Sequence, residues 1–564
     1  MTNALTERAL DWFSSHRATL DTARETIRTR AFWSAYPEVP SGKVYGETAN
    51  ADGKAAFEAR LGKTFDLGQP SSGTTTSTER SPYGIALDVS YPASEPDALL
   101  AAATDAMDAW AAAGVDKRTG VALEMLARLN KHSFEIAYAV MHTTGQAFMM
   151  AFQAGGPHAQ DRALEAVAYA YDEMSRVPQH VVWEKPQGKA EPLRIEKTFT
   201  VIPRGVDVTI GCSTFPNWNS YPGMFASLVT GNAVVVKPHP QAILPLAITV
   251  EIMRATLRDA GFDPNLVTLA VDSPDRPLAK ELAMRPEVAL IDYTGSSEFG
   301  TWLERNANAL VYTEKAGVNA VVLDSTADFT GMMRNLAMSF SLYSGQMCTT
   351  PQNVFVPRAG IDTDQGHKSF DDVVSAIVGA IDGLLGAPER AVDILGAIAT
   401  DGTLVRVDGE NDKPNVVRKS AALEHPLFPG ARIRTPLVAK LDVGDVERYD
   451  REMFGPIVYI IATDSTEQAL DLASGEAKRK GAITAILHST SPEVIVAGER
   501  KAAEGNVSLA INLTGSLLVN QSAAFSDFHV TGGNPAGNAS LTDAAFVANR
   551  FRVIETRRPA TSAN

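Results

Sequence analysis

The chain has 564 residues, of which 45% are hydrophobic and 21% charged, an ordinary balance for a globular protein. This length predicts roughly two to four domains. A formal net charge of −15 argues against nucleic acid and anionic membrane as partners, because both would repel the protein. The two cysteines, Cys212 and Cys348, are too few for a disulfide framework, so we expect a cytoplasmic protein.

The N-terminal third of the chain predicts mainly helices. Apolar spacing indicates an amphipathic helix over residues 5–30, followed by an irregular, aromatic-rich arm over 31–60. The Gly/Ser/Thr-rich stretch 68–84 is typical of an exposed connection. From 96 to 176, apolar residues recur at intervals of three and four, which predicts helices.

After residue 198 the pattern changes to an alternation of strands and helices. Such alternation predicts a parallel sheet with helices on its faces. The expected strands lie within 198–212, 232–238, 265–271 and 287–293 in a first unit, and within 319–324, 353–357, 456–462, 482–488 and 507–512 in a second. We expect the two α/β units to adjoin near residue 310.

Cys348 lies in the segment SLYSGQMCTTPQNVFV, among small and polar residues. A nucleophilic thiolate needs hydrogen-bond donors or positive charge around it, and the segment alone fits either a catalytic or a buried structural cysteine. Cys212, at a strand end, resembles a small hydrophobic residue. Glu314 is the last residue of a short apolar run. A carboxylate in this position is either a general base or an ordinary solvated side chain at the end of a strand.

Two further segments carry amides and a buried cation. In FPNWNSYPG, Asn217 and Asn219 can donate to an oxyanion, although this composition also suits a plain turn. Lys237 ends a buried strand, where a cation requires a ligand or an acid. Ligands of α/β sheets bind beyond the carboxyl ends of the strands.

Two glycine-containing turns follow later in the chain. IDYTGSSEFG places Gly295 and Ser296 between a strand and a helix, as in a phosphate cradle. In REMFGPIVYI, Glu452 and Phe454 precede a Gly-Pro pair and a strand, a pattern that an ordinary turn also has.

Together and in this order, six segments resemble motifs of the aldehyde dehydrogenase superfamily. They are WNSYPG, VVVKP, YTGSSEFG, TEKAGVN, SGQMC and EMFGP. Glu314 and Cys348 are 348 − 314 = 34 residues apart, close to the usual separation in that family. The resemblance implies two Rossmann-like parallel-sheet α/β domains and a small β oligomerisation extension, in a homodimer or homotetramer. The expected parts are a helical N-terminal extension (1–65), an NAD(P)-binding domain (66–310), a catalytic domain (311–513) and a C-terminal segment with the oligomerisation element (514–564).

The resemblance also implies a mechanism. Cys348 attacks an aldehyde, Asn219 and the Cys348 backbone N–H hold the oxyanion, hydride passes to NAD(P), and Glu314 activates the water that releases the acid. Residues expected to bind the cofactor are Lys237 and Glu452 at its ribose hydroxyls, Gly295 and Ser296 at its pyrophosphate, and Phe454. No metal site is expected.

Three departures from the family pattern matter. Residues 519–540 lack the usual P-F-G-G-x-K-x-S-G ending. Asn219 precedes Lys237 by 237 − 219 = 18 residues, fewer than usual, which keeps Asn217 open as the oxyanion donor. Lys237 is followed by Pro-His-Pro-Gln, with no acid to repel a 2′-phosphate. We therefore expect NADP, with His239 and Gln241 as candidate contacts of its 2′-phosphate and NAD as the alternative.

The helical N-terminus and the unusual C-terminus narrow the resemblance to phenylacetic acid degradation proteins of the PaaN group, in the form without a fused hydratase domain. The implied substrate is a coenzyme A-linked semialdehyde, 3-oxo-5,6-dehydrosuberyl-CoA semialdehyde. Retention of Glu314 favours hydrolysis of the thioester. The alternatives are a coenzyme A-acylating aldehyde dehydrogenase and a non-catalytic protein on the same scaffold.

Overall fold

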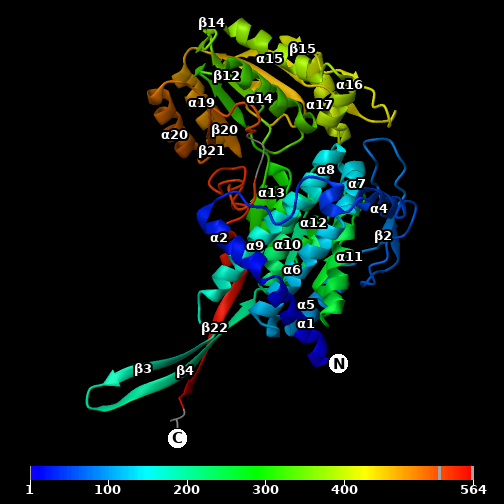
Figure 1. The fold of residues 1–564 in the computed structure, drawn as a ribbon, viewed down its shortest axis with the longest axis vertical. Helices are drawn as coiled ribbons and strands as arrows, with labels where there is room; N and C mark the ends of the chain where they lie inside the picture. The colour runs from blue at the N-terminus through cyan, green and yellow to red at the C-terminus, as the bar shows by residue number, and fades with distance from the viewer. Residues whose placement is uncertain (1, 519–522, 561–564) are drawn as a thin grey trace.

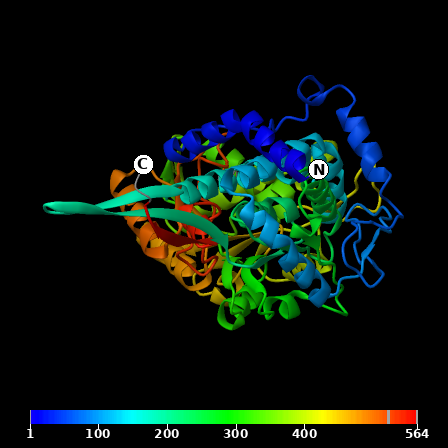
Figure 2. The same ribbon diagram turned by 90° about the horizontal axis from the view of Figure 1, so that it is seen from below.

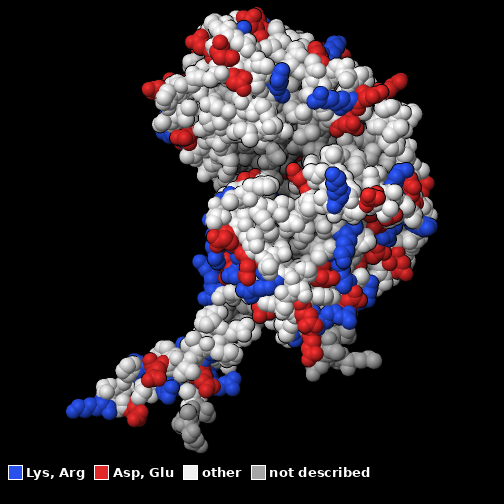
Figure 3. Space-filling model, in the orientation of Figure 1, with Lys and Arg blue, Asp and Glu red and all other residues white. Residues whose placement is uncertain are grey.

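The computed structural model describes residues 2–518 and 523–560, which form two α/β lobes and a long β-extension (Figure 1). Each lobe is built around one largely parallel sheet, so the two α/β units expected from the sequence are confirmed. The surface is hollowed between the lobes, and acidic and basic side chains are interspersed over this face (Figure 3).

The first lobe contains a five-stranded parallel sheet in the order β7-β6-β5-β8-β9. Its strands are β5 (Val206–Ile210), β6 (Ala233–Lys237), β7 (Val267–Leu269), β8 (Val288–Thr294) and β9 (Leu310–Glu314). Valine-rich β5 and β6 are buried throughout, as strands covered on both faces must be. The order reverses between β5 and β8, and ligands bind at the carboxyl ends beside such a switch point. Because β9 belongs to this sheet, the first lobe extends through Glu314, beyond the boundary expected at residue 310.

Helices pack around this sheet. They are α5 (Pro96–Ala112), α6 (Val115–Lys131), α7 (Ser133–Thr144), α8 (Phe148–Gly155), α9 (Pro157–Ser175), α10 (Pro216–Val229), α11 (Leu244–Asp259), η1 (Pro264–Leu266), α12 (Ala279–Ala283) and α13 (Ser297–Asn306). The helical region expected over 96–176 is confirmed and consists of five consecutive helices.

The N-terminal segment differs from its prediction in two places. The single helix expected over 5–30 is two helices, α1 (Thr2–Ser15) on α6 and α2 (Arg17–Thr29) on α9, because the backbone leaves helical geometry at His16. The arm over 31–60 is not irregular throughout: it contains α3 (Gly42–Tyr45) and α4 (Ala49–Glu58). Burial of Phe57 against α7 stabilises α4 in a segment of weak amphipathic pattern. The connection that follows carries a small antiparallel pair, β1 (Thr74–Thr76) and β2 (Ser90–Pro92).

The second lobe contains a seven-stranded sheet in the order β15-β18-β19-β12-β10-β20-β21, parallel except for β15. Its strands are β10 (Ala320–Leu323), β12 (Asn353–Pro357), β15 (Val416–Arg418), β18 (Leu437–Asp442), β19 (Ile457–Thr463), β20 (Thr484–His488) and β21 (Ser508–Ile511). Its helices are α14 (Phe329–Ser341), η2 (Leu342–Gly345), α15 (Phe370–Leu385), α16 (Pro388–Leu395), α17 (Asp401–Asn411), α18 (Val446–Tyr449), α19 (Thr466–Lys480) and α20 (Pro492–Gly505). Short strands complete the lobe: β11 (Ser325–Thr326), β13 (Ile361–Thr363), β14 (Gly366–Lys368), β16 (Ala422–Leu423) and β17 (Ile433–Arg434).

The extension is an antiparallel sheet in the order β22-β4-β3. The hairpin of β3 (His180–Gln187) and β4 (Ala190–Pro203) projects away from the lobes, and the C-terminal strand β22 (Phe551–Pro559) runs along β4 (Figure 2). A loop and the short α21 (Ala544–Ala548) lead into β22. Within the described ranges, no helix combines the length and the apolar character needed to cross a bilayer.

Candidate active site

Cys348 lies in the loop between α14 and β12, directly after the η2 turn. Three successive residues of this turn have left-handed backbone, the last being Gly345 with a φ of 65°. A Cβ at this position would overlap the carbonyl oxygen of Gly455, so only glycine fits without rearrangement. The turn therefore packs the SGQMC segment directly against the EMFGP segment.

Asn319 fixes the backbone of the Cys348 loop. Its Nδ2 donates to the carbonyl oxygens of Cys348 at 2.7 Å and Thr350 at 3.1 Å. Its Oδ1 accepts from the backbone N–H groups of Ile483 and Thr484, at the start of β20. Asn319 thus ties the loop to the start of β20 in the second sheet. Asn319 belongs to the TEKAGVN segment, but the sequence pattern assigns this side chain no role.

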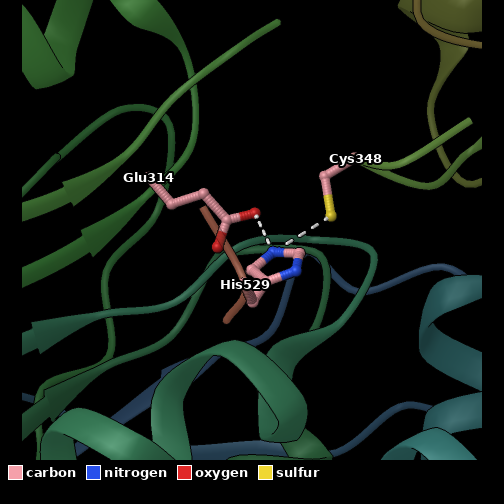
Figure 4. Close-up of side chains that lie close together, drawn as sticks. All are labelled: Glu314, Cys348 and His529. Atoms are coloured by element: carbon pink, nitrogen blue, oxygen red, sulfur yellow. Dashed lines mark hydrogen bonds and ion pairs between the residues drawn. The ribbon is translucent and has the colours of Figure 1, made fainter. Parts of the chain in front are cut away.

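Glu314 and Cys348 meet at one nitrogen of His529 (Figure 4). His529 Nε2 lies 3.1 Å from Glu314 Oε1 and 3.7 Å from Cys348 Sγ. Although Cys348 keeps some accessible surface, burial of its thiol and then the Glu314 carboxylate raise its pKa well above the usual range. The thiol is therefore protonated at neutral pH until its proton is accepted by a neighbouring group.

His529 does not appear among the residues expected from the sequence. It comes from the loop after residue 523, which has none of the recognised motifs. This loop lies against the end of β9, where the Lys315 N–H donates to the Ala536 carbonyl at 2.6 Å and Thr313 pairs with Asn538. The Trp218 and His529 rings pack in a T-shaped pair at a centroid distance of 4.6 Å, which limits rotation of the imidazole.

Of the two candidate asparagines, only Asn219 faces this cluster. Its Nδ2 donates to Glu314 Oε2 at 2.8 Å. Asn217 is fully buried and donates instead to Tyr221 at 2.9 Å and Thr249 at 3.2 Å. The geometry therefore favours Asn219 over Asn217 as a donor at the site.

Cys348 lies between two cavities. One, of about 190 Å³, also contains Asn219, Glu314 and most of the residues expected at the cofactor. The other, of about 330 Å³, is lined by Glu38, Met150, Gln153, Ala154, His158, Phe215, Trp218, Leu342, Met347, Cys348, Thr349, Ser516, Leu518 and His529. A thiol reached from both sides can meet a substrate in one cavity and a second reactant in the other.

A model of the aldehyde dehydrogenase family matches residues 89–512, which include Asn219, Glu314 and Cys348.

The chain belongs to the aldehyde dehydrogenase family. It is an NAD(P)-dependent oxidoreductase of that family. A crystal structure of an NAD-dependent aldehyde dehydrogenase from Burkholderia multivorans is 59% identical, with a TM-score of 0.96, and covers 98% of this chain and 99% of that chain.

More distant relatives share the same fold. The 1-pyrroline-5-carboxylate dehydrogenase from Thermus with bound NAD is 17% identical, with a TM-score of 0.74 over 94% of this chain and 99% of that chain, a likeness of fold alone. The N-succinylglutamate 5-semialdehyde dehydrogenase of Paraburkholderia xenovorans (strain LB400) is 28% identical over 391 residues, 68% of this chain and 74% of the relative.

In this aldehyde dehydrogenase, four of the expected cofactor residues line the smaller cavity together: Gly295, Ser296, Glu452 and Phe454. Ser296 is the N-cap of α13, so the free N–H groups of that helix begin at the cavity. A side chain at position 295 would collide with the Tyr293 ring, so glycine at this position leaves the backbone accessible from the cavity. Burial raises the pKa of Glu452 to about 7.

The fifth expected cofactor residue, Lys237, is not among the residues lining that cavity. It is buried at the end of β6, where its Nζ pairs with Asp272 Oδ2 at 2.8 Å. Burial lowers its pKa, and the Asp272 carboxylate opposes the shift. Burial and the Lys237 charge lower the pKa of His239 to about 4, so this imidazole is neutral at pH 7.

Proposed function

We propose that this enzyme oxidises an aldehyde to a carboxylic acid through a thioester on Cys348, with NAD as the hydride acceptor. The observation that carries the proposal is the position of Cys348 between the two cavities, in contact with His529 and beside Glu314. The larger cavity admits the aldehyde, and the smaller one holds the residues suited to a dinucleotide.

The side chains divide the chemistry as follows. The Cys348 thiol passes its proton to the Glu314–His529 pair, and Sγ forms a bond to the aldehyde carbon. Asn219 Nδ2, released from Glu314, and the Cys348 N–H donate to the oxygen that becomes negative. When bound, the dinucleotide accepts the hydride whose loss converts the adduct into a thioester. The first proton leaves the Glu314–His529 pair to solvent. Glu314 then takes a proton from water, which attacks the thioester carbon, and the same proton returns to Sγ as the acid is released and the thiol is restored.

The residues present fit a dinucleotide with free ribose hydroxyls. Asp272 Oδ1 and Gln241 Oε1 are buried acceptors without a partner among the described residues, and a ribose hydroxyl is a donor that a phosphate cannot replace. Neutral His239 supplies no charge for a 2′-phosphate. These features, with the NAD-dependent relative at 59% identity, support NAD over the NADP expected from the sequence.

For the substrate we propose a semialdehyde carried on coenzyme A, 3-oxo-5,6-dehydrosuberyl-CoA semialdehyde, as in the PaaN group. The described residues that line the larger cavity include no Lys or Arg, so the cavity suits an uncharged aldehyde end rather than a carboxylate. A long thioester keeps its anionic part outside this cavity. The motif resemblance and the cavity chemistry support the same substrate class.

The test is a panel of aldehydes, with and without a coenzyme A moiety, assayed with NAD and NADP separately. We expect the highest kcat/KM for the CoA-linked semialdehyde with NAD and no consumption of free coenzyme A. Faster oxidation of acidic semialdehydes without coenzyme A would overturn the substrate assignment. Consumption of free coenzyme A would establish the acylating alternative, and preference for NADP would overturn the cofactor assignment.

We also propose that the enzyme is a homo-oligomer, a dimer or tetramer, formed through the extension. Large apolar side chains are exposed on its strands: Val181, Val182, Trp183, Leu193, Val553 and Ile554. A second copy covering this surface would remove them from water. Both cysteines are free thiols, which fits the reducing cytoplasm expected from the sequence.

A further inference from the structure

Three potential metal ligands converge at the active site (Figure 4). Cys348 Sγ, His529 Nε2 and one carboxylate oxygen of Glu314 all lie within 4.8 Å of one another. They come from three segments that are far apart in the sequence: the end of β9, the loop before β12 and the loop after residue 523. No metal site is expected from the sequence, and His529 lies outside every motif.

The separations suit a tetrahedral zinc ion. Zinc binds thiolate at about 2.3 Å and imidazole or carboxylate at about 2.0–2.2 Å, so neighbouring ligands of a tetrahedral ion lie about 3.3–3.6 Å apart. The Sγ–Nε2 distance of 3.7 Å and the Nε2–Oε1 distance of 3.1 Å already approximate two such edges. Only the edge between Cys348 and Glu314, which is at most 4.8 Å, has to shorten, by about 1.2–1.5 Å at most.

The surroundings hold these ligands in place and leave one position open. Asn219 bonds the other oxygen of Glu314, which leaves Oε1 to face the metal position. Trp218 packs on the His529 ring and limits its rotation. Such supporting contacts raise metal affinity. The two cavities beside Cys348 provide an entry path and space for a water molecule as the fourth ligand.

We propose that Cys348, His529 and Glu314 form a zinc-binding site that switches this enzyme off reversibly. The ion replaces the thiol proton and occupies the sulfur lone pair that attacks the aldehyde, so a zinc-bound active site is inactive. Removal of zinc by a chelator restores the thiol. The thiolate ligand selects zinc over Mg²⁺ and Ca²⁺, which prefer oxygen ligands. The inference involves neither the aldehyde nor the nucleotide and goes beyond the proposed function.

The test measures zinc binding directly on the metal-free, full-length protein. Zn²⁺ is titrated in competition with a chromophoric chelator, and we expect one ion per chain. Cys348→Ser and His529→Asn should each weaken binding by at least about 100-fold. His158→Asn is the matched control, because His158 lines the same cavity but lies against Glu38 at 2.7 Å; it should keep full binding.

Two further readouts identify the ligands. Co²⁺ in place of zinc should give the sulfur-to-cobalt absorption band and the intense visible bands of a tetrahedral site, and both should be absent in Cys348→Ser. Zn²⁺ should protect Cys348 from iodoacetamide, with protection lost after chelation, whereas Mg²⁺ should give none. Circular dichroism and thermal unfolding establish that each variant is folded.

The absence of stoichiometric binding by the native chain, or full binding by folded Cys348→Ser or His529→Asn, would overturn the proposal. These measurements are made in the absence of aldehyde and nucleotide. The zinc site can therefore fail while aldehyde oxidation stands, and the proposed substrate can fail while the zinc site stands.

Discussion

Asn219 donates a hydrogen bond of 2.8 Å to Glu314 and so joins the first turns of α10 to the end of β9. The oxyanion donor and the general base of the proposed reaction are thus bonded to each other before substrate arrives. Their bond must break for Asn219 to reach the substrate oxygen. The bond therefore holds Glu314 in position until the substrate binds, and it frees the carboxylate when Asn219 turns to the substrate oxygen.

The pair of asparagines offers a matched comparison. Asn219→Ala removes a donor to the developing negative charge, and we expect kcat/KM to fall by about 10²–10³-fold. Asn217→Ala leaves the buried Tyr221–Thr249 pair one donor short, which should cost about 1–3 kcal/mol of stability with little effect on kcat/KM. Steady-state kinetics and urea unfolding measure both effects; the opposite pattern would make Asn217 the donor.

Replacement of the base should separate the two halves of the reaction. Glu314→Gln keeps an oxygen for the Asn219 bond but cannot take a proton from water. We expect a rapid burst of NADH close to one equivalent per site, followed by turnover slowed by about 10²–10⁴-fold. Stopped-flow absorbance measures both phases. An undiminished steady-state rate would show that another group activates the water.

The turn before the nucleophile should tolerate no side chain. Gly345→Ala forces a Cβ against Gly455 in a left-handed backbone, and we expect a loss of about 1–3 kcal/mol in the free energy of unfolding. Gly383→Ala is the control, because this glycine lies exposed in α15 with open space around it. Alanine there should stabilise the helix by about 0.5–1 kcal/mol. Equal changes in the free energy of urea unfolding for Gly345→Ala and Gly383→Ala would contradict the close approach of the SGQMC and EMFGP segments.

One buried carboxyl should make stability depend on pH. Burial raises the pKa of Glu476 to about 8, from an ordinary value of 4.5, although Asn353 donates to it at 3.0 Å. The folded protein therefore keeps this proton over a range where the unfolded chain has released it. The resulting stability is complete below the ordinary pKa and is lost as the pH rises through about 8.

Glu476→Gln cannot ionise and should escape this loss. Relative to the native chain, the variant should gain stability progressively from about pH 5 to about pH 9, by a few kcal/mol at about 1.4 kcal/mol per pKa unit. Urea unfolding at several pH values measures the difference. Parallel curves for the two proteins would show that the carboxyl is not shifted.

Local sequence patterns were sufficient for much of the fold and part of the site. Runs of valine that are buried on both faces, as in β6, identify central strands without further information. Cys348 and Glu314 could be singled out because their surroundings are short, contiguous motifs. The break between α1 and α2 could not be predicted in this way, because His16 is neither proline nor glycine. The helix is interrupted there because α1 packs on α6 and α2 packs on α9.

The remainder of the site depends on contacts between distant segments. His529 is 181 residues from Cys348 and 215 from Glu314, and no local pattern marks it. The Lys237–Asp272 pair likewise forms only because β6 and β7 are neighbours in the sheet. Residues 519–522, within the unusual ending noted in the sequence, lie outside the described residues.

The segment after residue 523 supplies both His529, which contacts Cys348 and Glu314, and β22, one strand of the extension. During translation, every strand of the two central sheets leaves the ribosome before this segment does. A nascent chain can therefore build both lobes while it still lacks His529 and the complete extension. Any oligomer that assembles through β22 consists only of chains whose synthesis has passed His529.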